Sequence, residues 1–276
     1  MLARPKTIIA LFLSCALTAK QAAGQRPPSA RPNIVTFAAT EYAFHGPTQA
    51  PPGFTTIRLQ NRGKEVHWME IFRLSDGKTA TDFIAAVTAG KTGFQPPHSW
   101  TTAVGGPGWI GPGGTSNQTA YFQSGNYVLV CRFPGVDGVP HLKKGMMHAL
   151  HVRASALSSA AAEPQADITI TVSDSAFGLR VPISAGTHTV RVINKGSYRH
   201  ELYIFRLAPG KSMEDYRAWE RGGLTRSERP GRPSGGVTPF EAGTHVWFTA
   251  AFEAGEYIFG DESGEGREIF RTITVR

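Results

Sequence analysis

Alternating apolar and polar positions along the chain predict short β-strands. Residues 54–59 (FTTIRL) and 187–192 (THTVRV) alternate with a period of two, which places every second side chain on one face of a strand. Asn-x-Gly sequences at 61–63 and 194–196 follow these segments and are typical of turns. Many short strands separated by glycine and proline, with few helical stretches, indicate an antiparallel sandwich or barrel.

The whole pattern occurs twice along the chain. Each copy has one helical candidate, at 81–89 and at 213–220, placed between strands as a covering element. Two copies of one supersecondary unit are the simplest explanation. One offset of 133 residues relates three pairs of segments: EYAF at 41–44 and DSAF at 174–177, PG at 52–53 and AG at 185–186, and NRGKEVHWMEIFRL at 61–74 and NKGSYRHELYIFRL at 194–207.

The repeat defines the expected domain organisation. We expect one domain over residues 31–153 and a second over 167–276. The segment between them, 154–166 (ASALSSAAAEPQA), has the small and polar residues of a linker. The chain without its first segment is long enough for two domains of ordinary size.

Residues 1–24 have the order of a secretory signal peptide, with a basic start, an apolar run and then small residues. Cleavage after Gly24 fits this order, and a cut after Ala19 is the alternative. Lipoprotein anchoring through Cys15 is disfavoured by the bulky residues ahead of it. The apolar run is far shorter than the roughly 20 residues that span a bilayer, so we expect no membrane span. The expected location is periplasmic or secreted.

The net charge of +8 falls to +5 when residues 1–24 are removed. The remaining excess is spread along the chain and forms no basic block, so a nucleic-acid partner is not expected. Docking to acidic redox partners is compatible with this charge.

Cys131 is the only cysteine left after removal of residues 1–24, so no intrachain disulfide can form. A lone thiol in an oxidising compartment needs to be buried or bound. Cys131 follows a predicted strand, and His141 and Met146 lie in the loop after it, CRFPGVDGVPHLKKGM. His67 in VHWMEIF would come from a neighbouring strand. One thiolate, two imidazoles and a weak thioether are the ligands of a blue-copper electron-transfer site.

The first copy resembles the cupredoxin family in its Cys, His and Met loop and in the histidine that follows an Asn-x-Gly turn. The HLKKGM sequence at 141–146 is similar to the end of the type 1 copper loop in copper nitrite reductases. The resemblance implies an all-β chain of two tandem cupredoxin-like Greek-key β-sandwiches, each with a short inserted helix. It also implies one type 1 copper ion bound by His67, Cys131, His141 and Met146, with Met147 as the alternative to Met146.

One feature of the first copy departs from the family. Nine residues separate Cys131 from His141, a longer spacing than most cupredoxins use. The closeness of these two ligands is therefore the point that the structure has to decide.

The second copy lacks the ligands. Tyr127 and Val152 are 25 positions apart, whereas Tyr257 and Val275 are 18 apart, so seven residues are missing from the ligand segment. Asp261 stands in the place of Cys131. His200 remains in the place of His67, and we expect it to have a structural or hydrogen-bonding role.

The resemblance gives no support to an enzyme. The catalytic copper of nitrite reductases needs a histidine directly before the type 1 cysteine, and here Val130 occupies that position. The His-x-His pairs and the His-Cys-His run of multicopper oxidases are absent, as are Gly-x-Ser-x-Gly and His-Glu-x-x-His motifs.

Two functions remain as hypotheses. The first is an exported one-electron carrier or copper-binding protein that works with a redox partner protein or a copper donor or acceptor. Trp68, Trp109 and Phe133 would then supply an apolar shell around the metal. The second is a metal-free module of the same fold that binds a partner protein or small ligand. In that case the Gly-rich segment 103–114 is either a binding loop with Trp109 at its tip or a set of tight turns.

Overall fold

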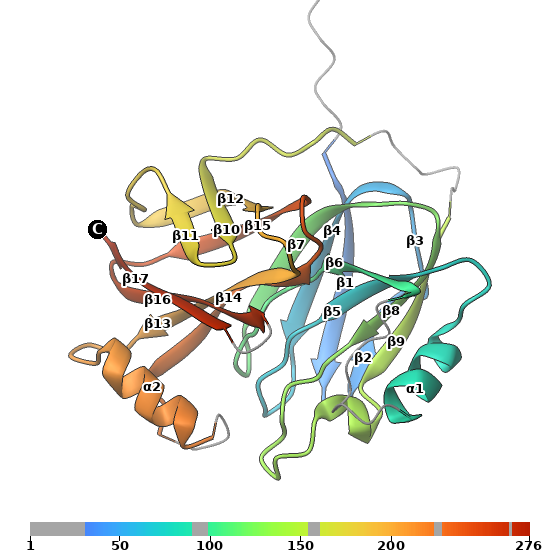
Figure 1. Cartoon of the computed structure of the whole chain (residues 1–276), viewed down its shortest axis with the longest axis horizontal. Helices are drawn as coiled ribbons and strands as arrows, with labels where there is room; N and C mark the ends of the chain where they lie inside the picture. The colour runs from blue at the N-terminus through green and yellow to red at the C-terminus, as the bar shows by residue number, and fades with distance from the viewer. Residues whose placement is uncertain (1–30, 90–98, 154–160, 224–227, 265–266) are drawn as a thin grey trace, which may run out of the picture.

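The chain folds into two β-sandwiches that lie side by side (Figure 1). This computed structural model describes residues 31–89, 99–153, 161–223, 228–264 and 267–276. The predicted signal peptide with Cys15 and the first part of the predicted linker, 154–160, lie outside the described residues. The expectation of an all-β fold with two sandwiches and one short helix in each is confirmed by the strand order of the described residues.

The first sandwich has two sheets. A parallel pair, β1 (Asn33–Thr40) with β4 (Gly53–Asn61), brings the start of the chain beside a later strand, while β4 pairs with β7 (Thr115–Phe122) in the antiparallel direction. The short β3 (Gln49–Ala50) also runs parallel to its neighbour β9 (Met147–Val152). The first sheet contains, in spatial order, β2 (Ala43–His45), β1 (Asn33–Thr40), β4 (Gly53–Asn61) and β7 (Thr115–Phe122). The second contains β6 (Thr101–Gly105), β5 (Glu70–Leu74), β8 (Gly125–Val130), β9 (Met147–Val152) and β3 (Gln49–Ala50).

The second sandwich has the same plan. Its parallel pair is β10 (Ile168–Ser173) with β12 (Gly186–Asn194), and β12 pairs with β15 (His245–Phe252) in the antiparallel direction. The first sheet contains β11 (Ala176–Leu179), β10 (Ile168–Ser173), β12 (Gly186–Asn194) and β15 (His245–Phe252). The second contains β14 (Gly231–Phe240), β13 (His200–Leu207), β16 (Gly255–Gly264) and β17 (Arg267–Val275).

Corresponding strands join the two sandwiches. β7 meets β15 through the pair Thr119 and Trp247, and β6 meets β14 through Val104 and Phe240. The two layers therefore continue across the junction as one eight-stranded and one nine-stranded sheet. The arrangement resembles the interface of a symmetric dimer, in which the same surface of each unit makes the contact.

Each helix covers one sheet with aromatic side chains. Phe83 of α1 (Ala80–Ala89) stacks on Phe72 of β5, with ring centroids 5.6 Å apart. Tyr216 of α2 (Met213–Arg221) packs edge-on against Phe205 of β13 at 4.9 Å. Ser212 begins α2 with a capping box, which satisfies backbone N–H groups that the helix leaves unpaired. Neither of these described helices is long and apolar enough to cross a bilayer.

Candidate metal centre

His67 reaches the end of the first sandwich from the connection between β4 and β5. Its backbone N–H donates to the carbonyl of Ile110 at 3.2 Å, and the N–H of Ile110 donates back at 2.9 Å. The sequence predicted a continuous strand through VHWMEIF, but β5 begins only at Glu70. The partner segment contains Pro107, which has no N–H to donate, so only an isolated bridge forms at His67.

Cys131 directly follows β8. The nine residues after it form a loop that folds back toward Cys131. The backbone of Gly135 bonds that of Val139 across this excursion at 2.9 Å. The N–H of His141 then donates to the carbonyl of Phe133, also at 2.9 Å, at the start of the 3-10 helix His141–Lys144. The long spacing is therefore folded back on itself, and the Cys131 Sγ lies 3.5 Å from the Nδ1 of His141.

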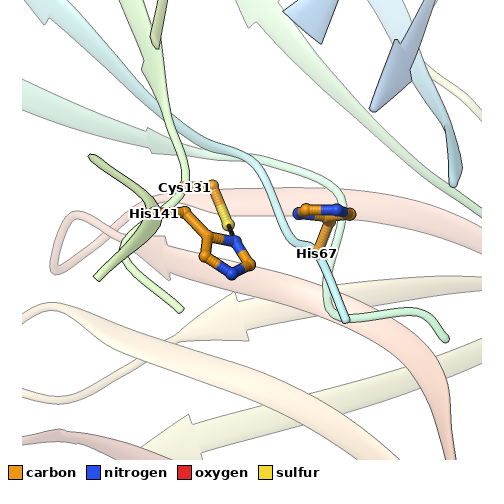
Figure 2. Close-up of side chains that lie close together, drawn as sticks. All are labelled: His67, Cys131 and His141. Atoms are coloured by element: carbon orange, nitrogen blue, oxygen red, sulfur yellow. Dashed lines mark hydrogen bonds between the residues drawn. The ribbon is translucent and has the colours of Figure 1, made fainter. Parts of the chain in front are cut away.

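The structure brings three of the predicted ligands together. One ligand atom from each of His67, Cys131 and His141 lies within 4.8 Å of the others, and all three residues are buried. Figure 2 shows the sulfur and the ring of His141 on one side and the ring of His67 on the other. The ring centroids of the two histidines are 4.8 Å apart.

Carboxylates lie behind both imidazoles. Glu65 Oε2 is 3.0 Å from the Nε2 of His141, and Glu41 Oε1 is 3.7 Å from the Nε2 of His67. The hydrogen bond to Glu65 fixes the ring of His141 and leaves its Nδ1 facing the sulfur. Sequence reasoning missed both carboxylates. Glu41 could have been found, because the 133-residue offset places another acidic residue, Asp174, at the same position of the second copy.

The hydrogen-bonding state of His67 indicates whether these residues could hold a metal ion. Neither of its ring nitrogens has a hydrogen-bond partner among the described residues, although the side chain is fully buried. A buried polar atom without a partner is costly, so an ion bound at the Nδ1 would compensate for the missing bond. A thiol and two imidazoles that share one buried point fit copper.

Burial shifts the pKa values of all three groups toward their neutral forms. It raises the pKa of the Cys131 thiol to about 12, and the backbone amides of Trp68 and Phe133 oppose this rise. It lowers the pKa of His67 to about 4 and also lowers that of His141, where the hydrogen bond to Glu65 opposes the shift. At neutral pH both imidazoles are therefore ready to bind a metal, whereas the thiol has to lose its proton.

Met146 lies next to the three residues through its backbone. Its N–H donates to the carbonyl of His141 at 3.0 Å, and its carbonyl accepts from the N–H of Cys131 at 3.2 Å. Gly145 makes the turn between the 3-10 helix and Met146 with a φ of 98°. Met146 is fully buried, while Met147 is half-buried and begins β9.

The three aromatic residues that the sequence suggested for an apolar shell pack on one another, and the ring of Phe133 lies 6.2 Å from that of His141. Trp68 and Phe133 are perpendicular, with ring centroids 5.3 Å apart, and Trp109 lies 5.8 Å from Phe133. The alternative hypothesis placed Trp109 at the tip of a binding loop, but its side chain is buried against Tyr203 of the second sandwich, with ring centroids 4.6 Å apart. Burial of an indole ring between two sandwiches removes more apolar area from water than a loop tip would.

The corresponding position in the second sandwich is filled by carboxylates. His200 Nδ1 lies 2.5 Å from Asp261, and its Nε2 lies 2.9 Å from Asp174. Both ring nitrogens therefore have partners, in contrast to those of His67. Among the described residues, the only grouping of ligands for a metal is the one in the first sandwich.

No family model matches the sequence, and no curated protein matches it either. Solved structures similar to this chain include the dithionite-reduced auracyanin of the photosynthetic bacterium Roseiflexus castenholzii, with 22% identity and a TM-score of 0.31, over 45% of this chain and 98% of that one. Auracyanin A, a blue copper protein of Chloroflexus aurantiacus, has 20% identity and a TM-score of 0.31, over 44% and 99%. A multicopper oxidase has 15% identity and a TM-score of 0.27, over 90% and 89%.

Proposed function

We propose that this chain is an exported one-electron carrier that binds a single type 1 copper ion in its first sandwich. His67 and His141 would be the imidazole ligands, Cys131 the thiolate and Met146 the axial thioether. The observation that carries the proposal is the approach of one sulfur and two imidazoles to a common buried point, within 4.8 Å of one another. Bound copper would supply a one-electron couple, because sulfur ligands favour Cu(I) and imidazoles suit Cu(II).

The protein's own contribution is rigid placement and exclusion of water. Both histidines and the cysteine are fully buried, so solvent does not compete for the ligand positions. Glu65 holds the ring of His141, and backbone hydrogen bonds tie Cys131, His141 and Met146 to one another. Ligands held in this way change little on electron transfer, which lowers the cost of moving between the two oxidation states.

Addition of Cu(II) to the purified protein tests the proposal. We expect one copper per chain and an intense visible thiolate-to-copper band, and we expect Cys131→Ser to abolish the band. His67→Gln should weaken copper binding, whereas His151→Gln, which changes an exposed histidine on β9, should not. A colourless protein that takes up no stoichiometric copper would overturn the proposal and favour a metal-free binding module.

Export and a redox partner are further parts of the proposal. The mass of the protein from the periplasm or medium should correspond to cleavage after Gly24 or Ala19, since residues 1–24 have the order of a signal peptide. The copper-loaded protein should exchange electrons with a redox protein or copper with a donor or acceptor. Turnover of nitrite or of a phenol, or a second metal per chain, would instead indicate an enzyme.

A further inference from the structure

A cavity of about 640 Å³ lies at the junction of the two sandwiches, and its lining contains none of His67, Cys131 and His141. Its walls are Ile110–Ser116 of the first sandwich and Arg232–Gly236 of the second, with Arg229 beside them. Residues 248–251 of β15 line the cavity where this strand meets β7. Residues 110–114 of the Gly-rich segment 103–114, for which a binding loop and a set of tight turns were the two interpretations, thus form one wall, although Trp109 itself packs against Tyr203.

The charged residues of the cavity lining are two arginines, and the described lining contains no carboxylate. Arg232 has a partner outside the lining, because its guanidinium lies 2.9 Å from a carboxylate oxygen of Glu253. Arg229 is half-buried and makes no hydrogen bond or ion pair within the described part of the chain. Burial accordingly lowers the pKa of Arg229 with no acidic group to oppose it. A partly buried guanidinium without a counter-charge is unfavourable, and an anion would relieve this.

Glycines and hydroxyl groups shape the rest of the cavity. A Cβ on Gly235 would come within 3.3 Å of the Oγ of Ser116, and the φ of Gly235 is +96°, so glycine keeps this wall open. Ser116, Thr115 and Thr249 are lining residues that carry hydroxyl groups, and hydroxyl groups can donate to oxyanions. The hydroxyl of Ser234 already donates to the carbonyl of Arg232 at 3.3 Å. The volume falls within the range of about 300–1,000 Å³ that small-molecule sites occupy.

We propose that this cavity is a binding site for a small organic anion that carries a carboxylate or a phosphate group. The planar guanidinium of Arg229 presents paired N–H donors that match two oxygens of either group. Arg232 adds positive charge at the second wall, and the hydroxyl groups complete the coordination of the oxygens. None of the lining residues is a proposed copper ligand, although the backbone of Ile110 in the lining pairs with that of His67.

Calorimetric titration of the full-length mature protein, prepared without added copper, tests this site. Inorganic phosphate and citrate are the probes, and sodium chloride at equal ionic strength is the reference. We expect saturable binding of at least one probe at one site per chain. Binding of phosphate alone identifies the group as a phosphate, and binding of citrate alone identifies it as a carboxylate. Heats no larger than those of sodium chloride for both probes would overturn the proposal.

Two substitutions locate the site. Arg229→Gln removes the unpaired charge, and we expect it to weaken binding at least tenfold. Arg180→Gln removes an exposed arginine after β11, three strands from β15 in the sheet, and should leave binding unchanged. Equal thermal midpoints of the two variants and the unaltered protein establish that both are folded. Unchanged affinity in the Arg229→Gln protein would exclude this cavity as the site.

Discussion

One histidine position is used in two ways in this molecule. His200 has a carboxylate at each ring nitrogen, whereas His67 has a distant carboxylate at one nitrogen and the Cys131 and His141 pair beyond the other. The difference between the two histidines follows from the exchange of Cys131 for Asp261. The carboxylate of Asp261 accepts a hydrogen bond from His200, whereas the thiol of Cys131 makes no hydrogen bond with His67. Both ring nitrogens of the histidine in the second sandwich therefore have hydrogen-bond partners, whereas those of the histidine in the first have none among the described residues.

Substitution of Glu65 tests how strongly the carboxylate behind His141 supports the site. Hydrogen bonds from His141 and Tyr42 hold the pKa of Glu65 below its usual value, although burial acts to raise it, so Glu65 is an anion at neutral pH. Loss of such a partner typically costs 10–100-fold in metal affinity. We therefore expect Glu65→Gln to weaken copper binding by about that factor in a competitive titration.

Glu214→Gln, which neutralises an exposed carboxylate on α2, serves as the matched control for this experiment and should have no effect. Copper affinity in Glu65→Gln equal to that of the control would show that the backbone alone orients His141.

The buried His67 makes the stability of the metal-free protein depend on pH. Its pKa is about 4 in the folded protein and 6.5 as an ordinary value, so below pH 6.5 the unfolded chain binds a proton that the folded chain does not. The free energy of unfolding should then decrease as the pH falls from 6.5 to 4, by about 3 kcal/mol over the whole range from this group.

Urea unfolding at pH 7 and pH 4.5, in the presence of a chelator, measures this change. Other groups also titrate in this range, so the informative quantity is the difference from His67→Gln, which lacks the titrating imidazole. An equal loss of stability in both proteins would contradict the assignment.

The turns that end β4 and β12 position the two histidines that follow them. Asn61 Nδ2 donates to the carbonyls of Glu65 at 2.7 Å and Ile110 at 3.0 Å, and its Oδ1 accepts from the N–H of Gly63. Asn194 makes the same three bonds, to Tyr198, Phe240 and Gly196. The Asn-x-Gly sequence therefore does more than form a turn, since it ties the chain ahead of each histidine to a neighbouring segment.

The two asparagines provide a matched pair of substitutions. Each side chain is buried and makes three hydrogen bonds, worth about 1 kcal/mol each. Asn61→Ala and Asn194→Ala should each lower the free energy of unfolding by about 2–4 kcal/mol. Only Asn61→Ala should also weaken copper binding, because the segment it holds leads to His67. Equal copper affinities in the two variants would show that the turn does not position the ligand.

One cluster of buried apolar side chains extends through both sandwiches of the molecule. Trp109 from the first sandwich contacts Tyr203 of the second, and paired strands cross the junction in both layers. Asn117 adds two hydrogen bonds to the backbone of Thr249 across the same junction. Because the two halves share a core, we expect them to unfold together.

Trp109→Ala tests this coupling. Removal of a fully packed indole ring costs about 3–5 kcal/mol, and here the lost contacts join the two sandwiches. We expect a single unfolding transition for the unaltered protein by calorimetry, and a lower midpoint or two transitions for the variant. Trp100→Ala, which changes a half-buried ring beside α1, should lower the midpoint less. Two transitions in the unaltered protein would show that the sandwiches are independent.

The fold class and the identity of the three grouped residues could be predicted from the chain alone. Period-two alternation and turn chemistry depend on neighbouring residues, so they can be interpreted from the chain alone, as in the segments that became β4 and β12. The lone Cys131 and the order of His67, His141 and Met146 came from composition and spacing. The repeat also identified His200 as the position to compare with His67.

How these residues meet in space could not be predicted from the chain and follows from the packing of distant segments. The return of the chain between Cys131 and His141, the carboxylates of Glu41 and Glu65, and the cavity beside Arg229 depend on contacts between segments far apart in the sequence. Alternation and turn signals carry no information about such distances, because side-chain neighbours across sheets and junctions are set by packing. The burial of Trp109 has the same cause, since the second sandwich covers a residue that its own neighbours would leave exposed.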